Sequence, residues 1–197
     1  MSDQAKGKLI IISGPSGAGK STIVKKLITS CPLPLKLSIS ATTRPQRGDD
    51  RPGENYIFLS DEEFQSKVQN DEFLEYVEVF GRGHWYGTLK AQVSTSLDQG
   101  DWLILEIDVE GAQKVKTSFP DSVSIFIHPG NLDELEKRLR GRATDDDDAI
   151  ARRLEVASQE MEVSVVYDHV VVNRTIEQTV QDICDLLTQL SDQSVIN

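Results

Sequence analysis

Apolar residues along this chain of 197 residues form two alternating patterns, short runs and positions at helical spacing. The runs predict core strands at residues 9–12, 102–108, 123–127 and 170–172. Apolar residues three or four positions apart predict helices that carry Ile23 and Leu27, Val93 and Leu97, residues 110–119, Leu132 to Leu139, Ile150 to Met161, and Ile176 to Leu190. This alternation predicts an α/β fold, with a parallel sheet between two layers of helices.

Residues 40–88 interrupt that alternation. Residues 45–55 are rich in Pro, Gly, Arg and Asp, which is typical of a loop, and short strands are expected at 56–59 and 73–80. Between these strands, a capping-box pattern at Ser60 predicts the start of a helix. We therefore expect a small, mostly-β insertion attached to the α/β core.

The first predicted strand leads into a glycine-rich loop, Gly14-Pro15-Ser16-Gly17-Ala18-Gly19-Lys20-Ser21. This sequence matches the phosphate-binding pattern G-x-x-x-x-G-K-S/T at every fixed position. Its glycines let backbone N–H groups converge on phosphate oxygens, and the helix that follows directs its positive end at the same anion. Lys20 can reach the outer phosphates, and the Ser21 hydroxyl can ligate Mg²⁺. A turn without a ligand is the alternative, but the flanking strand and helix favour a nucleotide site.

The chain is acidic, with a formal net charge of −11. This charge argues against broad binding to nucleic acid or to an anionic membrane. Phosphates are therefore expected to bind at local clusters of cations. The sequence offers two such clusters: Arg44, Arg47 and Arg51, and Lys137, Arg138, Arg140, Arg142, Arg152 and Arg153.

The two cysteines, Cys31 and Cys184, occur without a CxxC or His-rich metal pattern. We therefore expect reduced thiols in a cytoplasmic protein. No apolar run is long enough to span a bilayer, and residues 1–4 do not resemble a signal peptide. Small-molecule substrates, rather than nucleic acid or membrane, are the expected partners of a monomer or small homo-oligomer.

Alternating apolar residues at Leu35, Leu37 and Ile39 predict a half-buried strand. The end of this strand and the residues after it read Ser38-Ile39-Ser40-Ala41-Thr42-Thr43-Arg44-Pro45-Gln46-Arg47. The two guanidinium groups of this segment suit a phosphate monoester. With this segment the chain resembles the guanylate kinase family, which phosphorylates GMP with ATP, from about residue 8 to 190. Besides the phosphate loop and S-x-S-x-T-T-R-x-x-R, the likeness rests on Gly53 to Tyr56, Phe73-Leu74-Glu75, Tyr86-Gly87-Thr88, Leu105 to Asp108 with Gly111-Ala112, Gly141-Arg142 and Arg153-Leu154.

The resemblance implies a single guanylate-kinase-like domain, residues 1–197, with three parts. The core would comprise about 8–39, 89–136 and 158–190, the GMP-binding lobe about 40–88, and a helical lid about 137–157. The family usually has Gly after the lid arginine, where this chain has Ala143. The four acids from Asp145 to Asp148 are interpreted as the start of the next helix, where they suit the helix dipole.

Carried over by position, the resemblance also implies a site. ATP would be held by Gly14, Pro15, Ser16, Gly17, Ala18, Gly19, Lys20, Ser21 and Thr22, with Asn173 near the adenine. GMP would be held by Ser40, Glu75, Thr88 and Glu106 around the guanine and by Arg44, Arg47, Tyr56 and Tyr86 at its phosphate, and Asp108 would also belong to the GMP site. Lys20, Arg44, Arg142 and Arg153 would be catalytic, the last two from the lid, and Ser21 would be the Mg²⁺ ligand.

Glu75 is expected to select guanine over adenine. Guanine offers N1–H and its 2-amino group as adjacent donors, which one carboxylate can accept, whereas adenine presents an acceptor at N1. A buried polar site of this kind can reject the wrong ligand by about 10⁴-fold. From the residues alone, Glu75 could equally be a solvent-facing strand residue, and Tyr56 and Tyr86 could be ordinary core aromatics.

The implied reaction is attack by a GMP phosphate oxygen on the γ-phosphorus of ATP. That oxygen is already anionic near pH 7, so we expect cations and positioning, rather than a general base, to carry the reaction. Asp108 is expected either to help order Mg²⁺ or to cap the helix near residue 110. Two other functions stay open: a non-catalytic guanylate-kinase-like interaction module, and a related kinase for a ribosyl bisphosphate. The intact loop argues against the first, and Ser40, Glu75 and Thr88 argue against the second.

Overall fold

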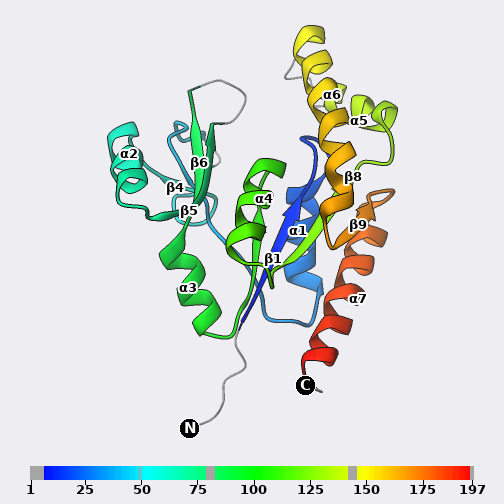
Figure 1. Ribbon diagram of the computed structural model, residues 1–197. Helices are drawn as coiled ribbons and strands as arrows, with labels where there is room; N and C mark the ends of the chain where they lie inside the picture. Colours follow the sequence, from blue (N-terminus) through cyan, green and yellow to red (C-terminus); the bar gives the residue numbers. More distant parts are fainter. Residues whose placement is uncertain (1–6, 49, 79–82, 142–145, 196–197) are drawn as a thin grey trace.

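The structure is a computed structural model that describes residues 7–48, 50–78, 83–141 and 146–195. Its centre is a five-stranded parallel sheet in the order β2-β7-β1-β8-β9. The strands of this sheet are β1 (Lys8–Ser13), β2 (Leu35–Leu37), β7 (Trp102–Glu106), β8 (Val123–His128) and β9 (His169–Val172). Figure 1 shows the sheet crossing the middle of the molecule, with helices on both sides.

The central strand β1 supplies side chains to both layers of the core. Ile10 and Ile12 pack with α1 (Lys20–Ser30) and α7 (Ile176–Val195), whereas Leu9 and Ile11 pack with α3 (Lys90–Asp98) and α4 (Val109–Ser118). All four side chains are almost fully buried. A strand that faces helices on both sides needs an unbroken apolar run, so the three-layer α/β fold predicted from that run is confirmed.

Four short strands from the part of the insertion that the structure describes form a second, separate sheet in the order β4-β3-β6-β5. Its elements are β3 (Ala41–Thr42), β4 (Ile57–Phe58), α2 (Asp61–Gln69), β5 (Phe73–Glu78) and β6 (Trp85–Leu89). Ala41, Phe64 and Phe73 form a small core of their own. The mostly-β insertion is therefore present as expected, and residues 79 and 80 of the predicted strand lie outside the described residues.

A third part follows β8. It consists of α5 (Leu132–Arg140) and α6 (Asp147–Glu162), which share an apolar contact through Leu135, Leu139 and Ala157, and a short 3₁₀ turn, η1 (Val163–Val166). Asp146 caps α6, and two further acids lie in its first turn, as the acidic run predicted. Figure 1 shows the α5–α6 pair and the insertion on opposite sides of the sheet edge at which β1 ends. Within the described ranges, no helix is long and apolar enough to cross a membrane.

Candidate active site

The phosphate loop lies at the carboxyl end of β1, where the backbone takes conformations that only glycine adopts easily. Gly14 has φ +140°, and a Cβ there would lie 2.4 Å from the carbonyl oxygen of Ile127. Gly19 caps α1 with φ +96°, and a Cβ there would lie 2.7 Å from the side-chain nitrogen of Asn173. Glycine at these two positions lets the loop approach Ile127 of β8 and Asn173, which follows β9, and Gly19 places the loop at the N-terminus of α1.

Asn173 and Arg138 hold the loop against the end of β9. The buried Asn173 amide donates to the Ala18 carbonyl oxygen at 2.7 Å and accepts from the Thr179 hydroxyl at 3.2 Å. Arg138 Nη2 donates to the Asn173 carbonyl oxygen at 2.8 Å. The Asn173 side chain therefore supports the phosphate loop, and a contact with adenine stays a prediction. Sequence reasoning placed Arg138 only in a cation cluster and missed this bridging role.

Ser21 and Asp108, the two residues expected near the metal, make different contacts in the structure. The Ser21 hydroxyl donates to Glu106 Oε1 at 2.5 Å, which links the first turn of α1 to the end of β7. Asp108 is the N-cap of α4, where it accepts from the Gly111 N–H at 2.7 Å. Burial raises the pKa of Asp108, and the charge of Lys20 opposes that rise. Asp108 therefore caps α4, which is one of the two roles expected for it, and Glu106 is the acid that contacts Ser21.

Glu75 is a buried carboxylate at the junction between the insertion and the core. It is 5% exposed and accepts from the Thr88 hydroxyl at 2.6 Å. A register shift in β5 between Phe73 and Glu75 accompanies their burial in different places, Phe73 in the small core of the insertion and Glu75 beside Gly111 of α4. A Cβ on Gly111 would lie 3.0 Å from Glu75 Oε2 and 3.1 Å from Asp108 Oδ1, so the two carboxylates flank the start of α4.

Desolvation decides the protonation of Glu75. Burial raises its pKa to about 7, and the nearby charge of Asp108 acts in the same direction, while the Thr88 hydrogen bond opposes the shift. The solvent-facing interpretation of Glu75 is therefore wrong. A buried carboxylate with spare acceptor capacity is suited to a ligand that brings paired N–H donors.

Arg44 is the buried cation of the insertion. Its guanidinium lies 5.2 Å from the ring centre of Tyr56 and 5.6 Å from that of Phe58, and Tyr56 packs edge-on against Tyr86 at 5.8 Å. Burial raises the pKa of Tyr56. Asp50, which sequence reasoning did not single out, pairs with Arg44 Nη1 at 2.9 Å.

Two other predicted residues are less engaged. The Arg47 side chain is exposed, although its backbone N–H donates to Asp50 Oδ2 at 2.7 Å. Ser40 is half-buried, and its carbonyl oxygen accepts from the Ile57 N–H at 2.9 Å. The structure therefore gathers Arg44, Tyr56 and Tyr86 into one group and leaves the Arg47 side chain in solvent.

The second cation cluster separates into different roles. Arg153, on α6, donates through Nη2 to the Ser16 hydroxyl at 2.6 Å and so reaches the phosphate loop. Arg140 instead pairs with Glu136 and Asp147, and Lys137 pairs with Glu134. Arg142 lies outside the described residues. Among the described members of the cluster, Arg138 and Arg153 are the two that hydrogen-bond to the loop or to its support.

Glu160 is an acid near the site that the motifs did not indicate. It lies on α6 and is half-buried; burial raises its pKa to about 7, and the charge of Lys20 opposes the rise. Lys20 itself donates to the carbonyl oxygens of Gly14 at 2.6 Å and Pro15 at 3.0 Å. A single Glu among the apolar positions of α6 gave no indication that its carboxyl group would be half-buried and influenced by the charge of Lys20.

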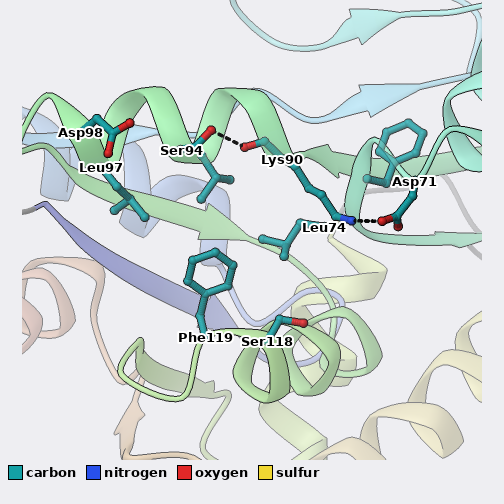
Figure 2. A pocket seen from close by; sticks show the side chains of 10 residues that line it. Asp71, Leu74, Lys90, Ser94, Leu97, Asp98, Ser118 and Phe119 are labelled. Carbon is teal, nitrogen blue, oxygen red and sulfur yellow. Dashed lines mark hydrogen bonds and ion pairs between the residues drawn. The ribbon is translucent and has the colours of Figure 1, made fainter.

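A cavity of about 610 Å³ lies away from the phosphate loop. Figure 2 shows it between α3, β5 and the end of α4, with Leu74, Leu97 and Phe119 around it and the Lys90–Asp71 ion pair at its rim. None of the predicted site residues lines this cavity. It is therefore distinct from the group of residues that surrounds the loop.

Together, the parallel sheet and the glycine-rich loop at the end of its central strand define a phosphate-loop nucleotide-binding protein. The model of the family described as guanylate kinase matches residues 6–190. The guanylate kinase of Rhodopirellula baltica is 48% identical over 182 residues, which cover 92% of this chain and 87% of that protein. The guanylate kinase of Fusobacterium nucleatum is 45% identical over 181 residues, 92% of this chain and 96% of its own.

Solved structures agree with the sequence comparison. A crystal structure of guanylate kinase from Anaplasma phagocytophilum superposes with a TM-score of 0.75 at 33% identity, covering 94% of this chain and 86% of that one. A shikimate kinase from Bacteroides thetaiotaomicron shares the fold alone, with a TM-score of 0.51 at 15% identity, covering 92% and 98% of the two chains. The chain belongs to the guanylate kinase family.

Proposed function

We propose that this protein transfers the γ-phosphoryl group of ATP to GMP, and also to dGMP. The observation that carries the proposal is the buried Glu75 carboxylate, held by Thr88 beside the start of α4 and close to Asp108. Asp108 follows β7, whose last residue pairs with β1 (Ile12↔Glu106), so it lies at the same end of the sheet as the phosphate loop that follows β1. A carboxylate that can read guanine thus lies near a phosphate cradle, and the family membership supports the same pair of substrates.

On the ATP side, the loop from Gly14 to Ser21 would hold the phosphates through its backbone N–H groups, with Thr22 following in α1. Lys20, now bonded to two loop carbonyls, would exchange them for phosphate oxygens. Arg153 is close enough to Ser16 to reach the same phosphates, and Arg142 is proposed to join it. Asn173 would fix the loop and border the adenine.

The Mg²⁺ that would accompany ATP fits the side chains near the loop. Ser21 and Glu106 present a hydroxyl and a carboxylate oxygen, the hard donors that this cation prefers. Ser21 would be the direct ligand, and Glu106 would orient its hydroxyl. When bound, the ion would offset negative charge on the β- and γ-phosphates.

On the GMP side, Glu75 would accept the N1–H and 2-amino donors, with Thr88, Ser40 and Asp108 around the base. Arg44, Tyr56 and Tyr86 would hold the phosphate, and Arg47 would turn inward from its exposed position to join them. Glu106 was also expected at the guanine, but its hydrogen bond to Ser21 supports the metal side instead.

The chemistry assigned to the chain is positioning and charge compensation. Arg44 would hold the attacking phosphate oxygen in line, while Lys20, Arg142 and Arg153 would stabilise the charge of the transferring group. The described site needs no proton acceptor for a phosphate oxygen that is already ionised near pH 7. Closure of the proposed lid, about 137–157, over the loop would exclude water and limit hydrolysis of ATP.

A coupled assay of ADP release tests the proposal with GMP, dGMP, AMP, CMP and a ribosyl bisphosphate as acceptors. GMP and dGMP should be used well and the others poorly. A preference for AMP would contradict the role of Glu75, and a preference for the ribosyl bisphosphate would favour the related kinase activity. Failure to bind ATP would favour a protein-interaction module.

We further propose that the protein acts on these small molecules in the cytoplasm, as a monomer or small homo-oligomer. Its two cysteines are buried free thiols, which suits a reducing compartment. Gel filtration and cell fractionation test these two statements.

A further inference from the structure

The one buried arginine proposed to hold the acceptor's phosphate is already paired with a carboxylate of its own loop. Arg44 and Asp50 form an ion pair at 2.9 Å, and their side chains are only 8% and 16% exposed. Asp50 Oδ2 also accepts from the Arg47 N–H at 2.7 Å. A single carboxylate oxygen, Asp50 Oδ2, therefore contacts both Arg44 and the Arg47 backbone, the two residues that the family resemblance assigns to the GMP phosphate.

The guanidinium has little room to avoid this carboxylate. Arg44 Nη1 donates to the Pro45 carbonyl oxygen at 2.8 Å as well as pairing with Asp50, and the rings of Tyr56 and Phe58 lie within 6 Å of the guanidinium carbon. A phosphate monoester that binds Arg44 must either displace Asp50 or lie next to it. Displacement breaks the ion pair of Arg44 with Asp50, and binding alongside brings a phosphate of up to two negative charges next to a carboxylate, so both routes oppose binding.

Electrostatics within the pair points the same way. The hydrogen bond to Arg44 lowers the pKa of Asp50, and the hydrogen bond to Asp50 raises the pKa of Arg44, so the pair is fully charged at neutral pH. Asp50 is thus a permanent anion at the place where the substrate's anion is needed.

We propose that the Asp50 carboxylate competes with the acceptor's phosphate for Arg44 and thereby weakens the affinity of the site for phosphate monoesters. This inference rests on the proposed function, because that function assigns the phosphate to Arg44. Asp50 acts through Arg44 and does not touch the reacting atoms. It lowers the affinity for GMP and holds the guanidinium near the rings of Tyr56 and Phe58.

The alternative role for Asp50 is purely structural, as a staple that closes the loop between residues 47 and 50. The two roles predict opposite effects of Asp50→Asn. An asparagine keeps an oxygen that can accept from Arg44 and from the Arg47 N–H, but it removes the negative charge. If Asp50 competes, the variant should bind phosphate more tightly; if Asp50 is only a staple, binding should be unchanged or weaker.

The experiment measures dissociation constants by calorimetry for Asp50→Asn, Asp50→Glu and the wild type. The probes are GMP and inorganic phosphate, each titrated into protein saturated with Mg²⁺ and the β,γ-imido analogue of ATP, so that the phosphate loop is filled. Glu54→Gln is the matched control, because Glu54 is an exposed acid of the same loop that pairs with Arg51 and not with Arg44. The KM values for GMP and ATP are measured in parallel.

We expect Asp50→Asn to bind GMP and inorganic phosphate about three- to tenfold more tightly, which is the effect of one nearby charge in a partly solvated site. The KM for ATP should not change, Asp50→Glu should remain close to the wild type, and Glu54→Gln should have no effect. Unchanged or weaker binding by Asp50→Asn would overturn the inference, as would an equal gain from Glu54→Gln, which would indicate a general charge effect.

The outcome is separable from that of the proposed function. If the Asp50→Asn variant bound phosphate more tightly than the wild type, but the wild type did not phosphorylate GMP, the proposed function would fail and the competition would stand. If GMP were phosphorylated but the variant bound neither probe more tightly, the function would stand and the competition would fail.

Discussion

The phosphate loop and the insertion are both expected to bind phosphate, but they are built from different materials. The loop uses backbone N–H groups of one continuous segment, and its essential residues are glycines at close approaches such as Gly14. The insertion uses side chains from separate elements, with Arg44 after β3, Tyr56 before β4 and Glu75 on β5. A backbone site is encoded locally, whereas a side-chain site needs a fold to assemble it and can be tuned one residue at a time.

The largest expected effect falls on the insertion alone. Glu75→Gln should raise the KM for GMP by about 10²- to 10³-fold, because the amide presents an N–H donor to one of guanine's donors and leaves it unpaired. ATP binding should be nearly intact, as measured by calorimetry with an ATP analogue. Glu78→Gln, an exposed position on the same strand, is the control. Equal loss of GMP and ATP binding would show that Glu75 is structural and that the two regions are not independent.

Glu106, at the end of β7, could serve either the phosphate loop or the guanine site. If it serves the loop through its hydrogen bond to Ser21, Glu106→Gln should lower kcat by about 10- to 100-fold and raise the Mg²⁺ concentration needed for half-maximal rate. The KM for GMP should change little, as steady-state kinetics at several Mg²⁺ concentrations can show. A large rise in the KM for GMP at unchanged Mg²⁺ dependence would return Glu106 to the guanine site.

Asn173 tests how far the loop depends on its support. Asn173→Ala removes the donor to the Ala18 carbonyl oxygen and the acceptor for Thr179, both in buried surroundings, and should lower the free energy of unfolding by about 1–3 kcal/mol. Affinity for ATP should fall more than affinity for GMP. Thr179→Val removes one of these bonds, together with the hydroxyl's hydrogen bond to the Thr175 carbonyl oxygen, but keeps the Ala18 contact and should cost less in urea denaturation. Equal loss of affinity for both substrates would mean that the loop and the insertion share this support.

The smallest expected effect is the pH dependence of GMP use. Burial holds the pKa of Glu75 at about 7 in the empty site, and guanine's donors require the ionised form. Below pH 7 binding must therefore release a proton, so the KM for GMP should rise by up to about tenfold per pH unit and level off above pH 7. Glu75→Gln should abolish this slope. A slope that persists in the variant would assign the titration to another group, such as Glu160, whose pKa is also about 7.

The same raised pKa has a consequence for stability. A carboxyl group whose pKa is higher in the folded than in the unfolded protein favours folding most below its unfolded pKa of 4.5, and that contribution is lost as the pH rises through 7. Without ligand, Glu75 therefore makes the protein less stable at neutral pH than at mildly acidic pH. This is the behaviour of a group retained for binding rather than for stability.

Sequence reasoning succeeded where the information is local. The strand at residues 9–12, the capping box at Ser60 and the acidic start of α6 each depend on neighbours in the chain, and each is present as predicted. It was less successful where several segments meet. Nothing near Asp50 indicated that this acid would pair with Arg44, and nothing near Glu160 indicated that burial would raise its pKa.

The sequence by itself determined the α/β class and the phosphate loop, because apolar periodicity and glycine spacing act over a few residues. The order and spacing of its motifs also carried the resemblance to the family. Only the tertiary structure decided which acid meets Ser21, that Glu75 is buried, and which arginines face the loop. Burial and charge pairing depend on distances between segments remote in sequence, such as the 2.5 Å between Ser21 and Glu106, and these exist only once the sheets and helices have packed.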